Sequence, residues 1–108
     1  MKPDFSEVLD AAAAQALVAR GELVEIRFFP TELGGPEDPL NIGYVTPEAA
    51  DEQEEVIDAL IERFEQGQLE MMDVQPDYRG LSIVPTRIRM KAWHRAKPNR
   101  YERVIEVW

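Results

Sequence analysis

The middle of the chain carries one long amphipathic segment, and any fold must bury its apolar stripe. Thr46 suits an N-cap, Pro47 suits the first helical position, and Gly67 ends the pattern. Between them the buried stripe follows the three- and four-residue spacing of a helix: Ala49, Ala50, Gln53, Val56, Ile57, Leu60, Ile61 and Phe64. This segment predicts a helix that packs against a sheet or another helix.

Shorter patterns on both sides predict a second helix and five strands. Residues 5–20 have helical spacing, with Asp4 and Glu7 as a capping box and Gly21 at the C-terminal end. Alternating apolar residues predict strands at 22–29, 40–45, 69–75, 81–95 and 100–108. The order α-β-β-α-β-β-β indicates a single α+β domain over residues 1–108. We expect an antiparallel sheet of four to five strands, with both helices packed on one face.

The last two strands decide which side chains face the core. Pairing Arg100 with either Arg95 or Lys97 gives the same two faces, because both registers have the same parity. The predicted core face holds Ile88, Met90, Ala92, His94, Tyr101, Arg103, Ile105 and Val107. The opposite side is a candidate interaction face, made of Arg87, Arg89, Lys91, Trp93 and Trp108.

This face has two interpretations. Arg and Trp side chains on an open sheet can stack on bases or hold an anion. Alternatively, the cations pair with Glu102 and Glu106 on the same face and only stabilise the sheet. We favour the second interpretation, since nucleic-acid-binding sheets rarely place Glu among their basic residues.

Charge divides the chain into two parts. Residues 1–78 hold 4 Lys and Arg against 19 Asp and Glu, whereas residues 79–108 hold 8 against 2. The outer side of the long helix carries a candidate acidic docking stripe: Asp51, Glu55, Asp58, Glu62 and Glu65. Only Arg63 offers opposite charge on this helix, and like charges one turn apart repel by a few tenths of a kcal/mol per pair. The stripe is either a docking surface for a basic partner or a solvated helix face.

No residue pattern predicts catalysis, a cofactor or a metal. The chain has no Cys and one His, which argues against disulfides, thiolate chemistry and a structural zinc site. His94 has no evident proton-transfer partner, and Gly34-Gly35 lacks the phosphate-loop pattern. We therefore expect no catalytic residue, no cofactor and no metal. The N-terminal residues have no signal-peptide pattern, so we expect a cytoplasmic protein.

These features favour a small acidic protein-interaction module of the adaptor, inhibitor or immunity type. The alternative is a binding module for an anionic ligand or nucleic acid that uses the basic face of the C-terminal hairpin. A small enzyme with a carboxylate-only site is a third hypothesis. We expect a protein partner or a second copy in a homodimer, because two Trp on an open face leave apolar area uncovered. We expect neither nucleic acid nor a membrane as partner.

Overall fold

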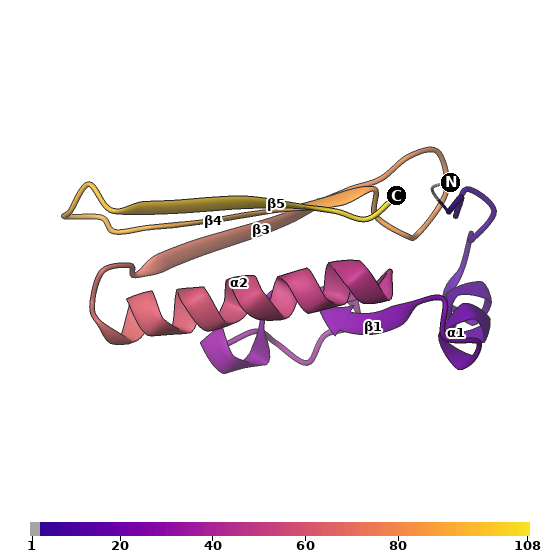
Figure 1. Ribbon diagram of the computed structural model, residues 1–108, viewed down its shortest axis with the longest axis horizontal. Helices are drawn as coiled ribbons and strands as arrows, with labels where there is room; N and C mark the ends of the chain where they lie inside the picture. The colour runs from indigo at the N-terminus through magenta and orange to yellow at the C-terminus, as the bar shows by residue number, and fades with distance from the viewer. Residues whose placement is uncertain (1–2) are drawn as a thin grey trace.

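A computed structural model describes residues 3–108 and confirms the α+β composition (Figure 1). The elements are α1 (Ala11–Ala19), β1 (Val24–Arg27), β2 (Ile42–Val45), α2 (Pro47–Glu65), β3 (Met71–Asp77), β4 (Arg87–Trp93) and β5 (Arg100–Glu106). Two short 3-10 helices, η1 (Thr31–Leu33) and η2 (Pro39–Asn41), lie between β1 and β2. The order of helices and strands along the chain is the predicted one.

The strands form two antiparallel sheets, where the sequence suggested one. β1 pairs with β2, and β3, β4 and β5 form a second sheet with β4 in the centre. Figure 1 shows α2 between the three-stranded sheet and β1, with α1 at one end of the molecule and away from the sheet face. β2 leads directly through Thr46 into α2, so the β1–β2 pair packs on one side of the helix and β5 on the other.

The α2 helix follows its sequence pattern closely. The Thr46 hydroxyl accepts a hydrogen bond from the Ala49 backbone N–H at 3.3 Å, and Pro47 occupies the first turn. The helix buries Ala49, Gln53, Val56, Ile57 and Leu60. Gln53 is polar, but its side-chain amide donates to the Arg27 carbonyl oxygen at 2.8 Å and so ties α2 to β1.

The α1 helix begins at Ala11, later than expected, and the predicted capping box is wrong. Asp10 is the N-cap, because its carboxylate accepts from the Ala13 N–H at 2.8 Å. The carboxylate of Asp4 accepts from Ser6 instead. The carbonyl oxygens of Phe5 and Val8 are bonded to the 82–83 loop, so this backbone is held in a turn.

Two strand limits also differ from the prediction. β3 extends through Pro76, which was expected in a turn, and pairs it with Ile88. Proline is tolerated there because β3 is an edge strand of the sheet. β4 begins at Arg87, and residues 81–86 form a loop that buries Val84 and Pro85.

The hairpin of β4 and β5 keeps the predicted faces but not the predicted registers. Trp93 pairs with Arg100, so neither Arg95 nor Lys97 does. The register is shifted by two residues from the first prediction and by four from the second, and an even shift preserves the parity. The core face is confirmed by the burial of Ile88, Met90, Ala92, Ile105 and Val107.

Candidate interaction surfaces

The face of the three-stranded sheet that points away from α2 has a basic central strand between two acidic edge strands. Directly paired residues share a face of a sheet. Arg87, Arg89, Lys91 and Trp93 of β4 therefore lie beside Asp77, Gln75, Asp73 and Met71 of β3, and beside Glu106, Val104, Glu102 and Arg100 of β5. We call these twelve residues the outer sheet face. It holds four basic and four acidic side chains, so it is electrically balanced.

Asp77 neutralises the basic strand most directly. Its two carboxylate oxygens lie 2.6 Å from Arg87 Nε and 3.0 Å from Arg89 Nη2. The hydrogen bonds from Arg87 and then Arg89 hold the pKa of Asp77 below its ordinary value. Arg89 also donates to the Gln75 side-chain oxygen at 3.1 Å. The carboxylate beside these two cations therefore comes from β3 of the same sheet.

Trp108 does not lie on the outer sheet face, so its assignment to the candidate interaction face is wrong. Its ring makes an edge contact with Phe5, at 6.1 Å between ring centroids, and its Nε1 donates to the Val84 carbonyl oxygen at 2.9 Å. β5 ends at Glu106, and the backbone N–H groups of Val107 and Trp108 both donate to the Thr86 carbonyl oxygen. Trp93 remains on the outer sheet face.

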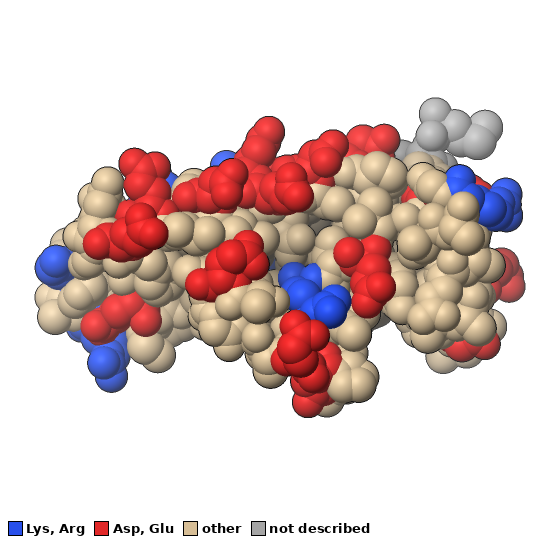
Figure 2. Space-filling model, turned by 90° about the horizontal axis from the view of Figure 1, so that it is seen from below, with Lys and Arg blue, Asp and Glu red and all other residues tan. Residues whose placement is uncertain are grey.

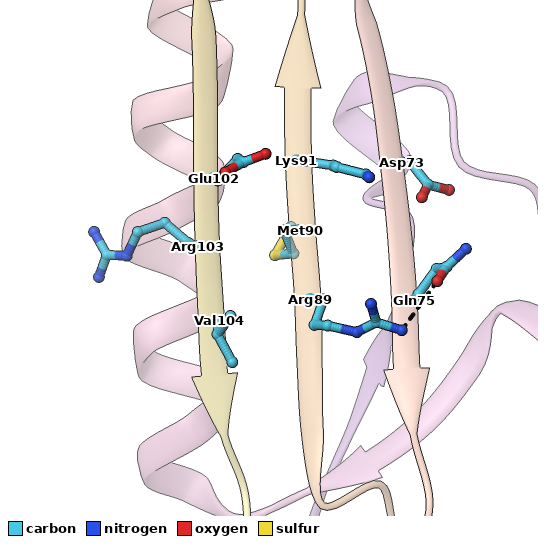
Figure 3. Close-up of a pocket in the computed structure, with 8 residues that line it drawn as sticks. All are labelled: Asp73, Gln75, Arg89, Met90, Lys91, Glu102, Arg103 and Val104. Atoms are coloured by element: carbon cyan, nitrogen blue, oxygen red, sulfur yellow. Dashed lines mark hydrogen bonds between the residues drawn. The ribbon is translucent and has the colours of Figure 1, made fainter.

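The outer sheet face is hollowed near its centre, as Figure 3 shows. This depression has a volume of about 290 Å³, and its outward-facing walls include Arg89 and Lys91 as well as Asp73 and Glu102. In Figure 3 the Lys91 side chain extends toward Asp73, and Arg89 extends toward Gln75. An anion placed here would approach two carboxylates together with the two cations, so the site has little net attraction for it.

The acidic docking stripe is a different kind of surface. Asp51, Glu55, Asp58, Glu62 and Glu65 are all exposed on α2. Among residues 3–108, none of the five forms an ion pair with Lys, Arg or His; the acid of α2 that does is Glu52, at 3.6 Å from Arg103. Arg63 turns away from the stripe, with its guanidinium 4.7 Å from the Tyr101 ring centroid. On the face seen in Figure 2, Asp and Glu side chains are more prominent than Lys and Arg side chains.

The His94 side chain stabilises the turn between β4 and β5. Its Nδ1 accepts from the backbone N–H groups of Ala96 and Lys97 at 3.0 and 3.2 Å. Glu70 accepts from both the backbone N–H and the Nε of Arg95, and these bonds lower the pKa of Glu70. This contact was not predicted from the sequence, although Glu70 directly precedes β3, which begins beside the turn.

Two further observations bear on ligands and membranes. Within the described residues, no three His, Asp or Glu side chains gather in an arrangement suited to a metal ion. No helix in that part of the chain combines the length and apolar composition needed to cross a bilayer.

Comparison with known protein families, curated proteins and solved structures gives no match.

Proposed function

We propose that this protein is an acidic interaction module, of the adaptor, inhibitor or immunity type, whose docking stripe on α2 binds a basic protein partner. The observation that carries the proposal is the contrast between the two charged surfaces. On the outer sheet face Arg87 and Arg89 form ion pairs with Asp77, and Lys91 lies between Asp73 and Glu102 in the register. The five carboxylates of the docking stripe, by contrast, form no ion pair with any described residue.

The geometry of the stripe suits a protein partner. Asp51 and Glu65 are separated along the helix by roughly 21 Å, at 1.5 Å per residue. The residues between them repeat every three or four positions on one side of a capped helix, so their spacing is fixed before binding. A row of basic side chains would relieve the repulsion within the stripe and would be drawn to it at long range.

The alternative, a site for an anionic ligand or nucleic acid on the outer sheet face, has weaker support. A phosphate contacting Arg87 or Arg89 competes with Asp77, which already holds both guanidinium groups. Lys91 lies between Asp73 and Glu102 in the pairing register. The approach of a polyanion to this face is therefore opposed by carboxylates on both edge strands.

The test uses a fluorescein-labelled peptide that repeats Lys-Ala-Ala-Lys as a probe for a basic partner. Fluorescence anisotropy measures its dissociation constant for the protein and for the Glu55→Lys/Asp58→Lys variant. The matched control is Glu102→Lys/Glu106→Lys, which changes the net charge equally but lies on the outer sheet face. We expect the stripe variant to weaken binding by about tenfold or more, and the control by much less.

A peptide affinity that falls equally in both variants would reflect net charge alone and would contradict the proposal. Salt-dependent retention of the wild-type protein on heparin, lost in Arg87→Glu/Lys91→Glu, would instead favour the anionic-ligand alternative.

A further inference from the structure

An apolar groove lies between β2 and the loop that joins β3 to β4. It has a volume of about 480 Å³, and none of its lining residues is charged. Its apolar walls include Leu40, Ile42, Tyr44, Tyr78, Leu81 and Ile83. The chain has a net charge of −9, so a hollow of this size without a charged lining residue differs from the rest of its surface.

Three large side chains at this groove extend into solvent. Leu40 is 90% exposed, Leu81 is 82% exposed and Tyr78 is 50% exposed. One exposed leucine is ordinary on a protein surface, but several around a single hollow form the kind of apolar patch that marks an interaction site.

The two leucines are held in these positions by buried polar neighbours. Asn41 follows Leu40, and its side chain bonds to both the N–H and the carbonyl oxygen of Phe29 at 2.8 and 2.9 Å. Ser82 follows Leu81, and its hydroxyl donates to the Phe5 carbonyl oxygen at 2.7 Å. Because these anchors fix the backbone beside each leucine, the groove is ordered before a ligand arrives, which lowers the entropy lost on binding.

The surface beside the groove is acidic. Glu25 lies directly across from Tyr44 in the β1–β2 pair, and so shares its face. The nearby cation, Arg27, is occupied by Glu25 at 3.4 Å and Glu37 at 3.2 Å. Asp38 immediately precedes the η2 turn that carries Leu40. On this side of the groove three carboxylates face one cation, so the border formed by Glu25, Glu37 and Asp38 is negative. On the other side the chain has a cation, Arg79, whose guanidinium lies over the Trp108 ring at 5.2 Å.

We propose that the groove receives a large apolar side chain of the basic partner, while flanking Lys or Arg side chains of the same segment meet Glu25, Glu37 and Asp38. This inference rests on the proposed function, because it specifies the chemistry of the partner segment. The groove would bind the apolar side chain of the partner, and the docking stripe on α2 would attract the other basic side chains of the same partner. Anchors buried in pockets carry most of the affinity in typical interfaces, and charges add steering and selectivity.

The test uses a fluorescein-labelled peptide with a Leu-Trp-Leu centre and Lys-Arg on each side, measured by anisotropy. Leu40→Ser and Leu81→Ser remove apolar surface without changing charge. Because both leucine side chains are exposed, neither substitution should disturb the fold. The matched control, Val104→Ser, removes an exposed apolar side chain from the outer sheet face. Each groove variant should bind about tenfold more weakly, as expected for the loss of one buried leucine, and the control should bind within about twofold of wild type.

The outcomes separate this inference from the proposed function. Unchanged binding by both leucine variants would overturn the groove assignment. The proposed function would not be affected by that result, because it is tested separately with the Glu55→Lys/Asp58→Lys variant. Equal binding of a peptide with Glu-Asp flanks would show that the groove does not select a basic segment. A concentration-dependent dimer of the wild-type chain, lost in Leu81→Ser, would make the occupant a second copy and would overturn the assignment to a partner.

Discussion

Neighbouring residues of β5 have opposite roles, because successive side chains of a strand point to opposite faces. Ile105 is fully buried at 0% exposure, whereas Val104 is 47% exposed on the outer sheet face. We predict that Ile105→Asp lowers the free energy of unfolding by several kcal/mol, since it buries an unpaired charge. Val104→Asp should change it by less than about 1 kcal/mol. Urea denaturation of the two variants measures this, and equal shifts would mean that the two faces are misassigned.

Asp77 makes stability depend on pH in a defined window. Its pKa is lowered by the hydrogen bonds from Arg87 and Arg89, so the folded state favours the carboxylate. A carboxylate of this kind stabilises the folded state at pH values above its ordinary pKa of about 4. This stabilisation is lost as pH falls through the lower pKa of the folded state. We predict that wild type is more stable than Asp77→Asn at neutral pH. This difference should begin to shrink as pH falls below about 4 and should be lost as pH falls through the lower folded pKa.

Urea midpoints of the two proteins across this pH range test the prediction. A difference that persists unchanged at about pH 2 would show that Asp77 stabilises the sheet by something other than its charge.

The turn of residues 5–8 is held in place by Ser82. This hydroxyl is buried, donates to the Phe5 carbonyl oxygen and accepts from the Val84 N–H at 3.1 Å. Ser82→Ala leaves both backbone groups without their partner, so we predict a loss of about 1–3 kcal/mol in unfolding free energy. Hydrogen exchange should quicken at Val8 and Val84 before the rest of the core. Ser6→Ala, at an exposed position in the same turn, should change stability by less than about 0.5 kcal/mol.

The same contact explains which elements the sequence could predict. The limits of α2 are encoded locally by Thr46, Pro47 and the stripe between them, and the faces of the β4–β5 hairpin depend only on parity. The start of α1 instead depends on a bond between Phe5 and Ser82, 77 residues apart. No local pattern contains that information, and helical spacing at residues 5–9 was therefore misleading.

The candidate surfaces were also predictable only where they depend on local patterns. The docking stripe and the basic β4 residues follow from the helical period and from strand alternation. Asp77 was missed because its role depends on the register of β3 with β4. Trp108 was misplaced because its ring packs on Phe5, near the other end of the chain, and bonds to the Val84 carbonyl oxygen. The groove joins η2 to a loop some forty residues later, so its leucines seemed unrelated in the sequence.

The outer sheet face, which no element of the chain covers among the described residues, favours pairing with a second copy. Two copies can pack with their outer sheet faces together, one displaced by the width of one strand. The basic strand β4 of each chain then lies over β5 of the other, which carries Glu102 and Glu106. Trp93, Met71 and Val104 add apolar area to this face. We predict a homodimer that dissociates as salt screens the charges, over a Debye length of about 8 Å at physiological ionic strength.

Light scattering after gel filtration, at low and high salt, measures the mass in solution. Arg89→Glu and Trp93→Ser should both shift the protein to monomer, because the first places like charges together and the second removes the largest apolar contact. Glu55→Gln, on the exposed side of α2, should leave the dimer intact and serves as the control. A monomer at every protein concentration and at both salt levels would exclude this dimer. The outer sheet face would then serve only to hold β3, β4 and β5 together through its cross-strand ion pairs.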